Sequence, residues 1–123
     1  MRAIVVAGMM VVAGVACGQE KWARDAVIGS VADITAGASF CGFTVDRSQI
    51  DAHLAASGFK RDDPTHSGAL DRDFALHSMV WQGANAAAQT TSEGKAALQG
   101  RCGQLWDAFG PDGIVRKGLL SKK

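Results

Sequence analysis

The stretch SFCGFTVDRSQIDAHLAASGF, residues 39–59, decides where the first helices of this chain begin and end. Gly42 can take the left-handed conformation that ends a helix, and the Thr-Val pair after Phe43 favours extended backbone. Asp46 is placed to cap a second helix, with Gln49 three residues later as its capping-box partner. The stretch therefore predicts a helix end, an extended link and a short second helix that ends at Gly58.

Apolar side chains recur with helical spacing upstream of this stretch, at i, i+4, i+7, i+11 and i+14. They are Val27, Val31, Ile34, Ala38 and Cys41. The pattern predicts a first helix from about Glu20 to Phe40, with Cys41 at its core-facing end.

Downstream, KRDDPTHSG at residues 60–68 is the most polar stretch and predicts an exposed loop. A long helix is expected after it, because one face carries Leu70, Phe74, His77, Trp81, Ala84 and Ala88. Leu76, Met79 and Val80 widen its apolar side, which predicts a central and mostly buried helix.

A further helix is predicted to begin at a capping box formed by Thr90 and Glu93. Its apolar positions are Leu98, Cys102, Leu105, Trp106 and Phe109, so Cys102 also faces the core. Gly110 and Pro111 are expected to end it, because Gly favours a helix C-terminus and Pro cannot continue one.

The N-terminus predicts a secretory signal peptide over residues 1–18. Arg2 precedes the apolar run AIVVAGMMVVAGVA, which is shorter than the roughly 20 residues of a membrane span. Removing 18 of the 123 residues leaves 105, enough for a single domain over residues 19–123. We therefore expect an exported bacterial protein, periplasmic or extracellular. The alternative is lipidation at Cys17, because AGVAC loosely resembles a lipoprotein signal, and only then would a membrane be a partner.

Cysteine usage favours one disulfide. Loss of the signal leaves Cys41 and Cys102, an even pair in a compartment where thiols are usually oxidised. Both lie on apolar helix faces, as an interhelical disulfide requires. The competing interpretation is a reactive Cys41 with His53 or His77 as its base, which needs Cys102 to remain unpaired.

Charge excludes a general electrostatic attraction to nucleic acid, since the formal charge of +1 falls to zero when Arg2 is lost. The basic C-terminal segment, residues 114–123, has two interpretations. It folds back and buries its apolar residues, or it forms an exposed apolar and basic stripe that contacts a partner. The candidate interaction residues are Ile114, Val115, Arg116, Lys117, Leu119 and Leu120.

Chemical motifs are few. Asp62, Asp63, His66, Asp71 and Asp73 form a local cluster that lacks metal-ligand spacing, so neither a metal nor another cofactor is expected. No haem, phosphate-loop or nucleophile-elbow motif is present.

His77 is the candidate pH-sensing residue. A buried imidazole on that helix face would have a lowered pKa and respond to acid. The alternative is a core histidine bonded to a carbonyl.

Five glycines fall inside predicted helices: Gly29, Gly37, Gly83, Gly94 and Gly100. Each costs about 1 kcal/mol relative to Ala. Close packing against a neighbouring helix or Trp ring is the favoured explanation, and a kink or ligand groove is the alternative.

These features predict an all-α fold, a small four- or five-helix bundle-like domain with one interhelical disulfide. In its export signal, helical pattern and single disulfide, the chain is similar to the small acid-activated chaperones of the bacterial periplasm. The likeness is architectural and assigns no residue roles. The sequence favours a non-enzymatic binding or interaction module of accessory, inhibitor or immunity type, whose partner is another protein or a small ligand. The alternatives are a pH-responsive periplasmic chaperone and a small hydrolase using Asp73 with His66 or His77.

Overall fold

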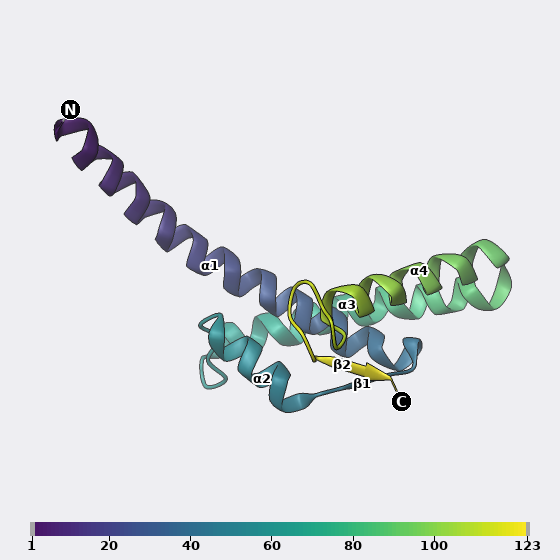
Figure 1. The fold of residues 1–123 in the computed structure, drawn as a ribbon. Coiled ribbons are helices and arrows are strands. Elements are labelled where there is room, and N and C mark those ends of the chain that lie inside the picture. The colour runs from purple at the N-terminus through teal and green to yellow at the C-terminus, as the bar shows by residue number, and fades with distance from the viewer. Residues whose placement is uncertain (1, 123) are drawn as a thin grey trace.

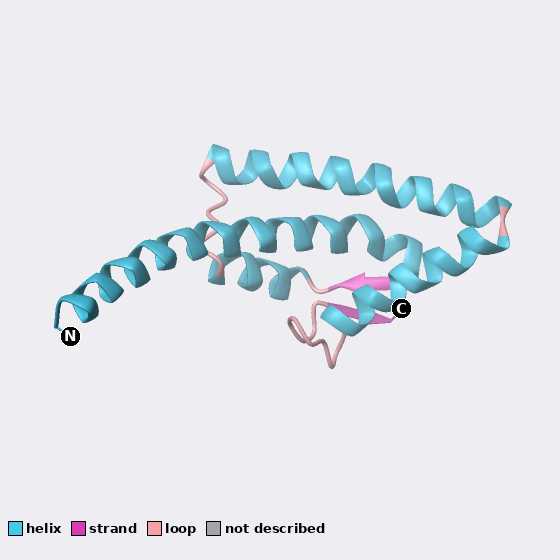
Figure 2. Ribbon diagram, turned by 90° about the horizontal axis from the view of Figure 1, so that it is seen from above, coloured by secondary structure: helices cyan, strands magenta, loops and turns pink. Residues whose placement is uncertain are grey.

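The computed structural model describes the backbone of residues 2–122 and the side chains of residues 21–122. The described backbone is mostly helical, with four helices and two short strands (Figures 1 and 2). In chain order the elements are α1 (Arg2–Cys41), β1 (Phe43–Val45), α2 (Arg47–Ala56), α3 (Pro64–Thr90), α4 (Ser92–Phe109) and β2 (Leu120–Lys122). The predicted predominance of helix is confirmed.

Helix α1 is the centre of the arrangement, with α3 on one side and α2 and the strands on the other (Figure 2). Helix α3 is the longest helix after it. It packs along α1 and forms a hairpin with α4, while α2 lies against α1 (Figure 2). The far end of the α3–α4 hairpin extends beyond α2 and the strands (Figure 1). Residues there have only the other arm of the hairpin as a neighbour, which limits how far they can be buried.

The two strands tie the end of α1 to the C-terminal segment. β1 and β2 are antiparallel, with Phe43 opposite Lys122 and Val45 opposite Leu120. The Asp46 backbone N–H donates to the Leu119 carbonyl oxygen at 2.9 Å. Leu119 and Leu120 are almost fully buried, so the fold-back interpretation is right for these two residues.

The core lies between α1, α2 and the α3–α4 hairpin. Its largest fully buried side chains are Trp81, Ile28, Ile34, Leu54, Leu119 and Leu120. The sulfurs of Cys41 and Cys102 lie at disulfide distance, 2.05 Å apart, and join the end of α1 to α4. Both cysteines pack against the core, as their positions on apolar helix faces predict.

Gly37 shows why at least one helical glycine is needed. A Cβ added there would lie 2.3 Å from Cε2 of Trp81, so the indole occupies the space of the missing side chain. Gly83 and Gly100 have nothing within 4 Å of such an atom, and packing does not explain them.

The N-cap predicted for the second helix is confirmed, but the reciprocal capping-box bond is not formed, because the Asp46 N–H donates to the Leu119 carbonyl oxygen. The Asp46 side chain accepts from the Gln49 N–H and Gly58 takes a positive φ of 90° beyond the helix end. The Ser48 hydroxyl and the Gln49 N–H lower the pKa of Asp46 by hydrogen bonding to its carboxylate.

Three other predicted boundaries need correction. α1 begins at Arg2 rather than near Glu20, since the apolar N-terminal run is itself helical. α3 begins at Pro64, inside the loop expected over residues 60–68, because Asp63 caps it and Pro suits the first helical position. α4 is capped by Thr91, whose side chain accepts from the Gly94 N–H, rather than by Thr90.

The prediction that the long helix is mostly buried is wrong. Trp81 is the one buried residue of α3, whereas Leu76, Met79 and Val80 are exposed. The apolar surface of α3 surrounds most of the helix, but α1 and α4 cover only part of it.

The signal peptide at residues 1–18 and lipidation at Cys17 concern side chains outside the described residues, and both remain predictions. Among the residues for which side chains are described, no helix has the length and apolar character to cross a membrane.

Candidate functional site

The largest group of exposed apolar side chains lies on α3. Leu76, Met79 and Val80 have exposed fractions of 56%, 69% and 47%, and their i, i+3 and i+4 spacing places them on one helix face. Gly83 extends this face by one turn without adding a side chain. We name Leu76, Met79, Val80 and Gly83 the α3 outer face, because the buried Trp81 points from another side of the helix.

The sequence pattern predicts that the three apolar residues of this face are buried in the core. A helix with apolar residues around most of its circumference is normally buried. Here the neighbouring helices cover the side that carries Trp81, and the outer face remains without a covering element among the described residues. Contiguous exposed apolar surface of this kind is typical of sites that contact another protein.

The predicted C-terminal interaction segment is divided by the fold. Ile114 is 86% exposed and Val115 is 61% exposed, whereas Leu119 and Leu120 are buried. Arg116 is partly exposed and Lys117 is exposed. The six residues therefore do not form one surface.

The exposed half of that segment is held in a defined conformation. The Ile114 N–H donates to the Asp107 carbonyl oxygen at 3.0 Å, and the Val115 and Arg116 N–H groups donate to that of Ala108 at 3.0 and 3.1 Å. We name residues 114–117 the C-terminal turn. It is a second, smaller candidate surface, fixed to the end of α4.

His77 lies in a polar cluster with Asp33 of α1 and Trp81 of α3. Its Nδ1 is 3.0 Å from Asp33 Oδ1, and the Trp81 indole N–H donates to the same oxygen at 2.7 Å. Because a carboxylate only accepts, His77 donates from Nδ1. The partner is thus a carboxylate rather than a backbone carbonyl, and the His77 side chain is 35% exposed rather than fully buried.

His53 is the buried histidine of the structure, whereas the sequence predicts His77 as the pH-sensing residue. It is 9% exposed, and its Nε2 has no hydrogen-bond partner among the described residues. Burial, and then the positive charge of Arg116, lower the pKa of His53 below 6.5. The sequence signal for its burial is the spacing of Ile50, His53 and Leu54, which places His53 on the apolar face of α2.

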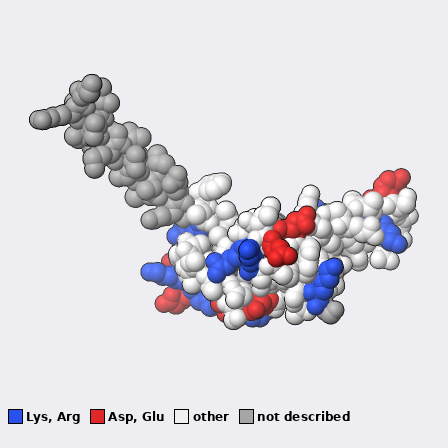
Figure 3. All heavy atoms as spheres, viewed as in Figure 1, with Lys and Arg blue, Asp and Glu red and all other residues white. Residues whose placement is uncertain are grey.

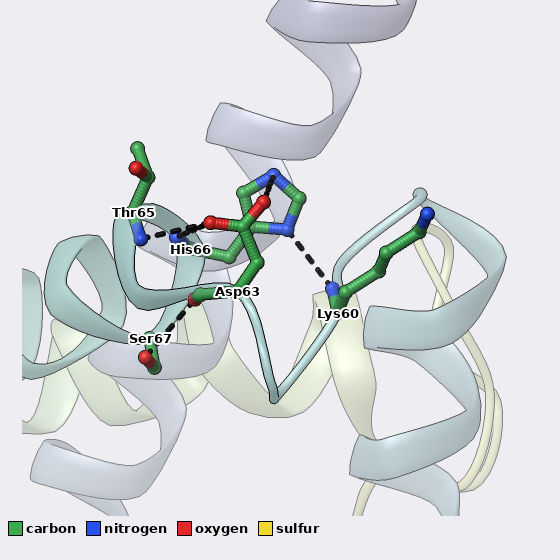
Figure 4. A network of polar contacts seen from close by, with 5 residues as sticks. All are labelled: Lys60, Asp63, Thr65, His66 and Ser67. Atoms are coloured by element: carbon green, nitrogen blue, oxygen red, sulfur yellow. Dashed lines mark hydrogen bonds and ion pairs between the residues drawn. The ribbon is translucent and has the colours of Figure 1, made fainter.

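The acidic and histidine cluster after α2 has a structural role at the start of α3 (Figure 4). The Asp63 carboxylate accepts from the N–H groups of Thr65 at 2.9 Å and His66 at 3.4 Å. These bonds, the Thr65 bond first, lower the pKa of Asp63. The Lys60 N–H donates to His66 Nδ1 at 3.0 Å, so a neutral His66 carries its proton on Nε2, 3.6 Å from Asp63 Oδ2. Phe59 stacks on the same imidazole.

The residues considered for hydrolysis do not converge. His66 pairs with Asp63 and His77 pairs with Asp33, and neither lies within ion-pair distance of Asp73 among the described side chains. Over residues 21–122 no group of three or more His, Cys, Asp or Glu side chains is placed to hold a metal ion.

Charge is distributed without a dominant sign. Figure 3 shows Lys and Arg side chains interspersed with Asp and Glu over the face of the molecule seen there. This face agrees with the near-neutral composition and carries no broad area of a single charge sign.

Comparisons with known proteins leave the site to be interpreted from its own geometry. No protein-family model, curated protein or solved structure matches this chain.

Proposed function

We propose that this chain is a small exported, non-enzymatic interaction module that binds another protein through the α3 outer face. The observation that carries the proposal is the exposure of Leu76, Met79 and Val80 on one face of a helix whose opposite side is anchored in the core. An accessory, inhibitor or immunity-type role, in the periplasm or outside the cell, is the functional class that we infer. A bundle-like domain over residues 19–123 is the architecture that goes with it.

The shape of the α3 outer face favours a helical partner. Three large side chains occupy about one helical turn. Gly83 has no side chain in the next turn, so a second helix can approach α3 closely there. Met suits such a surface because its unbranched side chain adapts to different neighbours. The anchoring of α3 against α1 means that binding does not require the helix to fold first.

The test is photo-crosslinking in the native host from single positions that carry a photoreactive amino acid. We expect crosslinks of one defined mass from positions 76 and 79, on the outer face. Position 82 is the matched control, because Gln82 is exposed on the same helix but outside that face. Position 114 tests the C-terminal turn.

Affinity for the captured partner then separates the two candidate surfaces. Met79→Glu should weaken binding at least about 10-fold, the usual effect at a central interface position. Gln82→Glu adds the same charge next to that face and should have little effect. Loss of binding in Ile114→Glu together with normal binding in Met79→Glu would show that the interface is the C-terminal turn instead. Absence of crosslinks from positions 76 and 79 would refute the proposal.

A further inference from the structure

A cleft of about 270 Å³ lies between α1, α2 and α3, away from the α3 outer face. Its floor is apolar and consists of Val31, Ile50 and Leu54, which are each at most 3% exposed. Leu70 and Phe74 of α3 form one side. The floor residues are nearly covered, so the apolar surface that a ligand can contact comes mainly from the half-buried Leu70 and from Phe74, which is 45% exposed.

The rim of the cleft carries three charged side chains, Arg47, Arg61 and Asp71. Arg61 pairs with Asp51 outside the cleft, but both side chains are more than half exposed, and exposed ion pairs are weak. Arg47 has no acidic partner within ion-pair distance among residues 21–122. The formal charge of the lining residues is therefore +1.

Helix stability does not explain Arg47. It is the first residue of α2, where the helix macrodipole disfavours a positive charge. Asp46 before it serves as the helix cap, with its carboxylate bonded to the Ser48 hydroxyl and the Gln49 N–H. Arg47 thus lines the cleft without an acidic partner among the described residues.

We propose that the cleft binds a small amphipathic carboxylate, with its apolar tail against Leu70 and Phe74 and its carboxylate between Arg47 and Arg61. The planar guanidinium group matches the geometry of a carboxylate and can donate two parallel hydrogen bonds to it. At about 30 Å³ for each water-sized group, the cleft holds roughly nine non-hydrogen atoms. A six-carbon acid such as hexanoate has this size and charge distribution.

The test is a titration of the isotope-labelled protein with sodium hexanoate, followed by backbone amide NMR. We expect saturable shifts at residues that line the cleft, such as Thr35, Arg47 and Leu70, with a dissociation constant of about 1 mM for a ligand of this size. Hexan-1-ol and hexylammonium should bind at least about 10-fold more weakly, because neither offers an anion to the arginines. Equal binding of hexan-1-ol, or equal shifts from inorganic phosphate, would overturn the proposal.

Variants of the two arginines and of Asp51 should change hexanoate binding in opposite directions. Arg47→Gln and Arg61→Gln should each weaken hexanoate binding about 3- to 10-fold, allowing for solvent exposure of the pair. Asp51→Asn should tighten it, because Arg61 loses its competing carboxylate. Arg72→Gln removes an exposed charge of α3 that does not line the cleft and should have no effect. Weakening by Arg72→Gln equal to that by Arg47→Gln would overturn the proposal.

This inference does not depend on the α3 outer face. Met79→Glu should leave hexanoate binding unchanged, and Arg47→Gln should leave partner capture from position 79 unchanged. Failure of one proposal is therefore distinguishable from failure of the other.

Discussion

Replacing Gly37 with Ala should destabilise the protein, although the same change in most helix interiors is stabilising. A Cβ at position 37 would lie 2.3 Å from Cε2, 2.5 Å from Cζ2 and 2.8 Å from Nε1 of Trp81. The indole cannot move aside easily. It is 1% exposed, its N–H donates to Asp33 at 2.7 Å, and the Arg101 guanidinium lies 5.0 Å from its ring centroid.

The magnitude follows from two opposing effects. Adding a methyl group to a filled core costs about 1–3 kcal/mol, and three contacts below 3.0 Å with a rigid ring place this site at about 3 kcal/mol. The better helix propensity of Ala offsets about 1 kcal/mol of that cost. We therefore expect Gly37→Ala to lower the free energy of unfolding by about 2 kcal/mol.

The assay is urea unfolding of the oxidised protein, followed by circular dichroism at a helix band. Gly83→Ala and Gly100→Ala are matched controls, since an added Cβ has nothing within 4 Å at either position. Both should raise the free energy of unfolding by up to about 1 kcal/mol. A Gly37→Ala protein that unfolds at the same or a higher urea concentration than the wild type would refute the close packing of Trp81 on α1.

Three further predictions concern the links that hold the core. Reducing the bond between Cys41 and Cys102, whose sequence separation is 61, should cost about 4 kcal/mol, measured as the difference in urea stability with and without reductant. Because burial lowers the pKa of His53 below its ordinary 6.5, its neutral form stabilises the fold above pH 6.5. The free energy of unfolding should decline as the pH falls from 6.5 to the lowered pKa, and His53→Gln should flatten that part of the stability profile. Asp33→Ala should cost about 1–3 kcal/mol in thermal or urea unfolding because Trp81 loses its buried acceptor, whereas Asp33→Asn keeps an acceptor oxygen and should cost less.

Local chemistry made several helix ends predictable from sequence. The cap at Asp46 and the stop at Gly110 depend on residues within one turn of each other, and the structure places both as expected. The start of α3 was missed although its signal was present, since an Asp followed by Pro marks a capped helix start as well as a loop. A polar stretch therefore has two local interpretations, which spacing alone does not separate.

The remaining features depend on contacts that are distant in the chain. Pairing of β1 with β2 joins three-residue segments that are far apart in the chain and too short to leave an alternating pattern. The exposure of Leu76 and Met79 depends on which side of α3 faces α1. Residue type alone does not distinguish the covered side from the exposed side, because both sides carry apolar residues. Arg47 and Arg61 meet at one cleft only because α2 folds back on α1, so the cleft had no sequence motif.

The pairing of β1 with β2 has a consequence for how the chain matures. Leu119 and Leu120 fill the core against helices that are synthesised well before them, and Asp46 receives its backbone bond partner only from Leu119. Until those residues emerge, the helices enclose an unfilled site. A chain made from the N-terminus onward thus completes its core packing only after Leu119 and Leu120 have been synthesised.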